Sequence, residues 1–333
     1  MPTPITLKDD AYQFPLYENG EKVFWYGEYW YFNFTDPVSG WSGIVGFTLF
    51  NPKNVYGLGA SAALVSLFGP QGQVITEMDF YRLKDFWAST REPNVTIGEN
   101  VLRPLDEQRY AVQIATKNGR VSLDFVFQRA DEPFWFTQDI RGELPWEVNS
   151  WLVYMPSALV QGTLTVDGNT STFEDGPGYH DHSWGIWDIP SREWAWAMFA
   201  SPDKELNCDL GYKTGFAESE GYFRFRDLRL QFRTQGLQWF WEDWKRWERL
   251  WQYPGRARCL AVDLTGQYQL DVTWTVGTNA AIWQSPILIF EQFSHFEGTL
   301  SRRDPSSPGG WALVTSFSER GQSEWVIPWK SAL

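Results

Sequence analysis

The chain has 333 residues, enough for two domains that each bury a hydrophobic core. Its formal net charge of −13 is spread along the sequence, which argues against nucleic acid as a partner. Two cysteines, Cys208 and Cys259, could pair but are too few for a disulfide framework, and a reducing compartment is the simpler assumption. No signal-peptide pattern and no membrane-spanning apolar run is visible, so we expect a cytoplasmic protein.

Aromatic residues are unusually frequent. The 21 Trp, 14 Tyr and 24 Phe residues make up 18% of the chain. Aromatic rings pack on half-buried faces of β-sheets, and their faces can also hold a cation. For any single ring the structural explanation is the simpler one. The excess as a whole indicates a wide apolar cavity or a surface for an oily ligand.

Most of the chain is predicted to be β-structure. Alternation of apolar and polar side chains with a period of two is typical of antiparallel strands with one buried face. In chain order, this alternation is found in residues 74–83, 121–128, 162–168, 228–233 and 267–276. Turn clusters separate the runs, and many short strands at such spacing predict barrels or sandwiches. We therefore expect an all-β fold with two domains, residues 1–165 and 166–333.

The first aromatic strand carries a carboxylate. In GEYWYFNF, residues 27–34, Glu28 shares one strand face with Trp30, Phe32 and Phe34. Burial in an apolar cavity disfavours the anion and can keep such a group protonated. Glu28 is therefore a candidate proton donor, with a strand-edge glutamate paired to an arginine as the alternative.

The stretch GPGYHDHSWG, residues 176–185, concentrates two of the three histidines. If the chain is extended after the Gly-Pro-Gly turn, His180 and His182 point to one side and Tyr179 to the other. The site could be a metal site, a structural corner of a sheet, or an acid–base or ligand-orienting site. A metal would need a third ligand, and the only other histidine is His295, so we favour the organic role.

Asp209, in LNCDLGY, is a second candidate acid. It shares a strand face with Asn207 and Lys213. Inside a barrel this polar face would line a cavity, and outside it would face solvent.

One segment, residues 237–252, departs from the β pattern. Its large apolar residues recur at spacings of three and four, namely Leu237, Phe240, Trp244, Trp247 and Trp251. This spacing predicts a single amphipathic, Trp-rich helix that ends before Pro254-Gly255. Such a helix most simply covers the open end or edge of the barrel; it could also act as a lid over a ligand or make peripheral membrane contact, and its balanced charges favour the lid over membrane contact.

Several of these motifs together resemble the carotenoid 1,2-hydratase, or hydroxyneurosporene-synthase-like, family. GPGYHDHSWG, followed by WAWAMF at residues 194–199, is similar to the central signature of that family, and GEYWYFNF is similar to its N-terminal element. Fungal Diels-Alderases that form decalin rings belong to the same structural group. The resemblance implies two lipocalin-like antiparallel β-domains, a hydrophobic pocket, and hydration, cyclisation or pericyclic chemistry without a cofactor.

The resemblance also suggests site residues. His182 and Trp184 match the family's His-x-Trp pair, and Asp209 matches its proposed proton donor, although Asn207 stands where the family has tyrosine. Ring faces could stabilise a carbocation formed by alkene protonation. The catalytic candidates are Asp209, His182 and Glu28; the substrate-binding candidates are Tyr179, Trp184, Trp194, Trp196, Asn207 and Trp30. We expect no metal and no cofactor.

Two functions remain open at this point. The first is a cofactor-independent cyclase, isomerase or hydratase of a hydrophobic polyene or terpenoid, acting by alkene protonation or by holding a polyene in a reactive conformer. The second is a non-catalytic lipocalin-like carrier of a lipid or pigment. The sequence lacks the G-x-S-x-G, G-x-G-x-x-G, P-loop and H-E-x-x-H motifs, which argues against hydrolases, kinases and nicotinamide enzymes.

Overall fold

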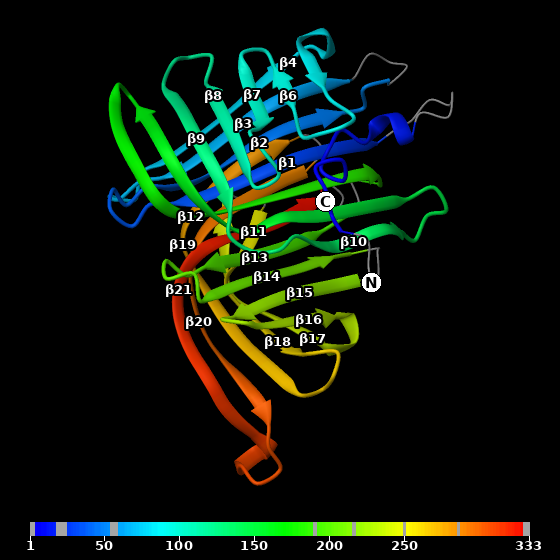
Figure 1. Ribbon diagram of the computed structural model, residues 1–333, viewed down its shortest axis with the longest axis vertical. Helices are drawn as coiled ribbons and strands as arrows, with labels where there is room; N and C mark the ends of the chain where they lie inside the picture. Colours follow the sequence, from blue (N-terminus) through cyan, green and yellow to red (C-terminus); the bar gives the residue numbers. More distant parts are fainter. Residues whose placement is uncertain are drawn as a thin grey trace. The chain divides into compact units, whose positions relative to one another are not determined.

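The computed structural model describes seven stretches of the chain, residues 4–17, 25–53, 59–188, 192–214, 218–248, 251–284 and 287–328 (Figure 1). Within these stretches the chain forms β-strands and short 3-10 helices, without an α-helix, so the expected all-β class is confirmed. The chain divides into two compact units, Met1–Asp188 and Ile189–Leu333. We expected the domain boundary between residues 165 and 166. These residues lie inside a long hairpin of unit 1, and unit 1 ends at Asp188.

Unit 1 forms a 12-stranded antiparallel sheet that curls into a nearly closed barrel (Figure 1). The strands follow one another in the order β4-β3-β2-β1-β12-β11-β9-β8-β7-β6-β5, and β10 pairs with β11. Their bounds are β1 (Tyr26–Thr35), β2 (Ser42–Phe50), β3 (Ala60–Phe68), β4 (Val74–Tyr81), β5 (Phe86–Ala88), β6 (Val95–Ile97), β7 (Asn100–Pro104), β8 (Arg109–Ala115), β9 (Val121–Arg129), β10 (Phe134–Arg141), β11 (Val148–Val166) and β12 (Asn169–Ile186). The 3-10 helices η1 (Phe14–Leu16) and η2 (Leu83–Asp85) precede β1 and β5.

The pairing of β1 with β12 brings the first aromatic strand beside the two histidines. In this antiparallel register Trp30 lies opposite His182, and Phe32 lies opposite His180. Directly opposed residues share one face of a sheet, so the histidines face the same barrel interior as the aromatic side chains.

Two glycines of β12, on either side of the histidines, allow β12 to pack closely against its other neighbour, β11. A Cβ atom on Gly178 would lie 2.4 Å from Cγ2 of Val160, and one on Gly185 would lie 2.1 Å from the carbonyl oxygen of Val148. Gly185 also has a φ of +149°, a conformation that side chains rarely adopt. These glycines let β12 approach β11 closely on both sides of the histidines.

Unit 2 forms a 9-stranded antiparallel sheet, a half-barrel, in the order β16-β15-β14-β13-β21-β20-β19-β18-β17. Its strands are β13 (Trp194–Ala200), β14 (Leu206–Lys213), β15 (Glu218–Phe225), β16 (Leu228–Arg233), β17 (Leu237–Trp247), β18 (Trp251–Val262), β19 (Tyr268–Gln284), β20 (Ile287–Arg303) and β21 (Trp311–Pro328). The 3-10 helices η4 (Thr234–Gly236) and η5 (Pro308–Gly310) precede β17 and β21. Cys208 and Cys259 are free thiols in the core of this unit, and burial raises the pKa of both.

The Trp-rich helix expected over residues 237–252 is wrong. Residues 237–247 form strand β17, and β18 begins at Trp251, while residues 249–250 lie outside the described part of the chain. Trp239 and Trp241 point to the unit 2 core and stack with ring centroids 5.5 Å apart, whereas Trp244 is 47% exposed. Packing of large aromatic rings against the sheet overrode the helical spacing, as β-propensity allows. No helix in the described stretches is long and apolar enough to cross a membrane.

Candidate functional site

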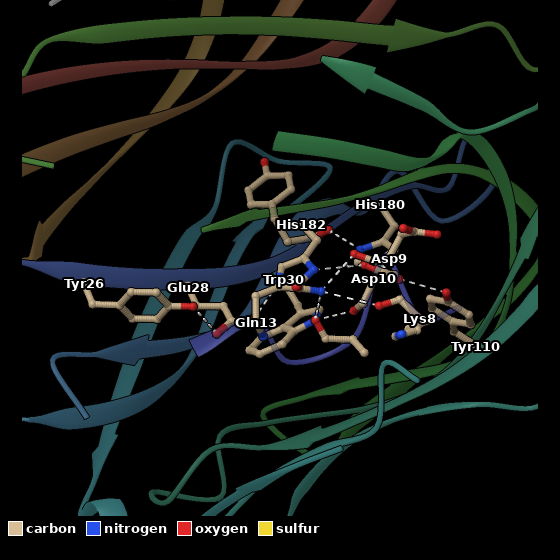
Figure 2. Close-up of polar contacts among 12 residues, drawn as sticks. Lys8, Asp9, Asp10, Gln13, Tyr26, Glu28, Trp30, Tyr110, His180 and His182 are labelled. Atoms are coloured by element: carbon tan, nitrogen blue, oxygen red, sulfur yellow. Dashed lines mark hydrogen bonds and ion pairs between the residues drawn. The ribbon is translucent and has the colours of Figure 1, made fainter. Parts of the chain in front are cut away.

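Four ionisable side chains meet in the interior of the unit 1 barrel: Asp10, Glu28, His180 and His182, termed here the acid–histidine cluster (Figure 2). Glu28 comes from β1, both histidines come from β12, and Asp10 comes from the segment that precedes η1. All four side chains are 0% exposed. Ionisable groups at this depth are stable only when they are paired.

The hydrogen bonds of His180 fix the position of two protons. Its Nδ1 lies 2.9 Å from the carbonyl oxygen of Tyr31, and because a carbonyl only accepts, Nδ1 carries a proton. Its Nε2 lies 3.0 Å from Oδ2 of Asp10, so a second proton lies between these two atoms. The Tyr110 hydroxyl also donates to Oδ2 of Asp10, over 2.8 Å.

His182 lies between the two carboxyl groups. Its Nε2 is 3.0 Å from Oε1 of Glu28, and its Nδ1 is 3.3 Å from Oδ1 of Asp10. Glu28 also accepts a bond of 2.6 Å from the Tyr26 hydroxyl and one of 2.8 Å from the backbone N–H of Gln13. The arginine considered above as an alternative partner of Glu28 is therefore replaced by a histidine, a tyrosine and a backbone amide.

Hydrogen bonds within the N-terminal segment fix its shape, and a bond from β1 ties it to the barrel. The Gln13 side-chain amide donates to the carbonyl oxygen of Ala11 over 2.7 Å and to that of Asp9 over 3.2 Å. The Trp30 indole donates to the carbonyl oxygen of Asp10 over 3.1 Å. These bonds hold the Asp10 carboxylate between the two imidazole rings, as Figure 2 shows.

Aromatic rings enclose the histidines. Trp30 stacks on His182 with centroids 4.5 Å apart and an interplanar angle of 18°, and Trp184 approaches the same ring at 4.5 Å. Phe32 stacks on His180 at 4.0 Å. Ring faces carry negative electrostatic potential, so this environment favours a positively charged imidazole.

Hydrogen bonds and charges shift the pKa values of Asp10 and His182 in opposite directions. Burial alone would raise the pKa of Asp10, but the charge of His180 and the hydrogen bonds from both histidines outweigh it and lower this pKa to about 2. For His182, burial lowers the pKa, but the hydrogen bonds and charges of Asp10 and Glu28 outweigh it and raise the pKa above its ordinary value of 6.5. The lowered pKa makes Asp10 the anion of the cluster.

These shifts predict a pH dependence of stability. The pKa of Asp10 is lowered from 3.8, so its contribution is present above pH 3.8 and is lost as the pH falls toward 2, a change of about 2 kcal/mol. The pKa of His182 is raised, so its contribution is present below pH 6.5 and is lost as the pH rises through the raised value. Melting temperatures of the wild type and Asp10→Asn across this range measure both effects. Identical pH profiles for the two proteins would contradict this assignment.

Four of the residues expected at the site gather on one face of unit 2. The Trp196 indole donates to Oδ1 of Asp209 over 2.7 Å, and Asn207 follows on the same face of β14. The Trp194 indole donates to Glu324 on β21. The side chains of Trp194, Trp196, Asn207, Asp209 and Glu324 make up what we term the acid–indole face. It lies on the side of the sheet opposite the unit 2 core.

The remaining candidates are divided as the strand alternation predicts. Trp30 and Trp184 contact His182, whereas Tyr179 points to the other side of β12 and donates to Oδ2 of Asp181 over 2.8 Å. His295, the third metal ligand considered above, lies on β20 with its side chain 48% exposed. Within the described stretches, no group of three or more His, Cys, Asp or Glu side chains is arranged to hold a metal.

Sequence reasoning missed Asp10 and Glu324. Asp10 lies in KDDAYQ, which has no strand periodicity and gives no cue that it enters the barrel. Glu324 had a weak cue, because in GQSEWVI it alternates with the core residue Trp325. Burial raises the pKa of Glu324, although hydrogen bonds with Trp194 and Glu291 oppose the shift.

Comparison with known proteins places the chain in a family. Residues 20–207 match the family described as Domain of unknown function (DUF7064). The chain belongs to this family. The matched region of this DUF7064 protein includes Glu28, His180 and His182, whereas Asp10 precedes it and Asp209 follows it. No curated protein sequence matches the chain significantly.

Solved structures share the fold. A protein assigned as AttH from Nitrosomonas europaea has a TM-score of 0.66 and 15% sequence identity, and the match covers 98% of this chain and 99% of that one. Kievitone hydratase from Nectria haematococca has a TM-score of 0.65 and 15% identity, over 92% of this chain and 90% of that one. The DUF7064 protein therefore has the same fold as a hydratase.

Proposed function

We propose that this DUF7064 protein hydrates or cyclises a hydrophobic alkene, with the acid–histidine cluster as proton donor and acceptor. The observation that carries the proposal is the position of His182, which lies between two fully buried carboxyl groups and against two indole rings. Such a group can hold and transfer a proton in an apolar environment. The fold shared with kievitone hydratase supports this class of reaction.

Hydration and cyclisation of an alkene can both proceed without a reagent other than water and a proton donor. In hydration, the cluster gives a proton to one alkene carbon, the oxygen of water bonds to the resulting carbocation, and one proton of that water returns to the cluster. In cyclisation, a second double bond supplies the electron pair that captures the cation, and loss of a proton from carbon restores the cluster. Both reactions need one group that changes protonation state twice.

The contacts in the cluster give each residue a proposed role. His182 exchanges its Nε2 proton with Glu28, which the Tyr26 hydroxyl and the Gln13 amide hold in place. Trp30 and Trp184 stabilise a nearby cation through their faces. Asp209 is the alternative proton donor, with Trp194, Trp196 and Asn207 on its sheet face and Tyr179 as a further substrate-binding candidate.

A non-catalytic carrier of a lipid or pigment is the second candidate function. Complete burial of all four cluster side chains, which pair with one another, favours it. Such a network could serve only to close the barrel around its N-terminal segment.

Product analysis distinguishes these functions. The purified protein is incubated with kievitone, with squalene as a linear polyene and with host extract, in ordinary and deuterated water, and the products are analysed by mass spectrometry. A gain of one water with a deuterium retained on carbon supports hydration, and an isomeric product supports cyclisation. Recovery of bound but unaltered compound would contradict the enzymatic proposal and support the carrier.

A further inference from the structure

The carboxylate of Asp10 fills a site that other parts of unit 1 build around it (Figure 2). Its Oδ2 lies 3.0 Å from Nε2 of His180 and accepts a hydrogen bond of 2.8 Å from the Tyr110 hydroxyl. Its Oδ1 lies 3.3 Å from Nδ1 of His182. The strands that carry these three partners, β8 and β12, both pair within the unit 1 sheet. Three side chains of the barrel thus converge on one carboxylate.

The three partner side chains are also held by contacts that do not involve this carboxylate. Nδ1 of His180 donates to a backbone carbonyl oxygen of β1 over 2.9 Å, and an indole of β1 stacks on His182. Tyr110 stacks on Tyr154 with ring centroids 5.4 Å apart. Because these contacts lie within the barrel, we expect the site to keep its shape when the carboxylate leaves. A preorganised site binds a matching group with little further cost in ordering.

The segment that carries Asp10, residues 4–17, is not a strand of the barrel. It forms turns and the 3-10 helix η1. The backbone N–H groups of Tyr12 and Gln13 donate to a barrel carbonyl oxygen over 3.0 Å and to Glu28 over 2.8 Å, and an indole of β1 donates to the carbonyl oxygen of Asp10. A segment that is bonded at a few points, rather than along a strand ladder, can leave while the sheet stays folded.

The same segment places apolar side chains against the barrel core. Phe14 is 3% exposed and meets Tyr26 with ring centroids 4.8 Å apart, and Tyr12 meets Phe86 at 5.6 Å. Leu7 also packs against this core. The segment therefore combines a carboxylate with an apolar body. Its departure would uncover an apolar surface, which favours an apolar ligand in its place.

We propose that the site filled by Asp10 is a carboxylate subsite, and that a hydrophobic carboxylic acid binds there by displacing the N-terminal segment. A neutral group in place of Asp10 would leave buried imidazole groups without their anion, whereas a carboxylate restores both the charge and the hydrogen bonds. The segment then acts as an internal competitor that closes the barrel until the acid binds. Glu28 and His182 keep their own contact and remain available for proton transfer.

This inference deepens the proposed function and rests on it for the hydrophobic alkene, to which it adds a carboxylate. The carboxylate subsite itself depends only on the contacts of Asp10 and of its segment.

The first test is rescue of Asp10→Ala by an external carboxylate. The variant lacks the carboxylate and keeps its partners, so acetate at about 0.1 M should raise its melting temperature by about 3–6 °C relative to chloride, whereas neutral acetamide should not. Asp9→Ala is the matched control, because the bonds described for that carboxylate come from Thr6, and it should show no such difference. Equal melting temperatures of Asp10→Ala in acetate, acetamide and chloride would overturn the proposal.

The second test uses the wild type, so it does not depend on the folding of a variant. Dodecanoate and dodecanol share one hydrocarbon chain and differ in the carboxylate, and hydrogen exchange followed by mass spectrometry reports on the segment and on the strands separately. We expect dodecanoate to speed exchange in residues 9–17 by about tenfold while β9 stays protected, and dodecanol to leave both unchanged. Unchanged exchange with dodecanoate, faster exchange throughout unit 1, or an equal effect of dodecanol would overturn the proposal.

Neither test depends on catalysis. Acetate and dodecanoate contain no carbon–carbon double bond, so neither is a substrate for hydration. The carboxylate subsite can therefore fail while alkene hydration stands, and hydration can fail while the subsite stands.

Discussion

His182→Gln is expected to lower turnover by about 100- to 10,000-fold while ligand affinity changes little, because the variant keeps a polar side chain but cannot carry the proton. The imidazole of His182 lies within 3.3 Å of the carboxyl groups of both Asp10 and Glu28. Within the cluster it is the side chain that connects these two groups. The measurement is the initial rate of product formation in the mass-spectrometric assay, normalised to folded protein.

Two further variants sharpen this result. Glu28→Gln retains the shape of the side chain and removes its charge, so it should also lose turnover if the proton passes between Glu28 and His182. His295→Gln alters a histidine that is 48% exposed on unit 2 and should leave the rate unchanged. Wild-type turnover in His182→Gln would remove this cluster from the chemistry and leave Asp209 as the proposed donor.

Asp10→Ala is expected to lower the free energy of unfolding by about 3–5 kcal/mol, because it leaves buried imidazole groups without their anion. The carboxylate lies 3.0 Å from Nε2 of His180 and 3.3 Å from Nδ1 of His182, and it also accepts a hydrogen bond from Tyr110. Chemical denaturation near pH 6 measures the loss. The affected unit should be unit 1, which contains every one of these partners.

The neighbouring residue provides the control for this prediction. Asp9→Ala removes a carboxylate from the same segment, but the bonds described for this carboxylate come only from the backbone N–H and the hydroxyl of Thr6. Its loss should cost about 1 kcal/mol. Equal losses in Asp9→Ala and Asp10→Ala would mean that the N-terminal segment acts as a simple cover and that the cluster charges contribute little.

Local patterns in the sequence were sufficient for the class of fold and for part of the site. Alternation along GEYWYFNF predicts that Glu28 and Trp30 share a face, and alternation along GYHDHSW predicts that His180 and His182 point one way and Tyr179 the other. The structure has both arrangements, because the side-chain period of a strand is a property of the extended backbone itself.

The contacts between distant segments depended on the tertiary structure. Asp10 lies in the barrel because its segment is bonded to β1 through the backbone N–H of Gln13 and the Trp30 indole, and Glu28 meets His182 because β1 pairs with β12. The Trp-rich segment shows the same limit, since its spacing suits a helix and its packing makes it a strand. Alternation follows from each residue's nearest neighbours, whereas pairing and packing follow from free energies shared among segments more than a hundred residues apart, which no local pattern records.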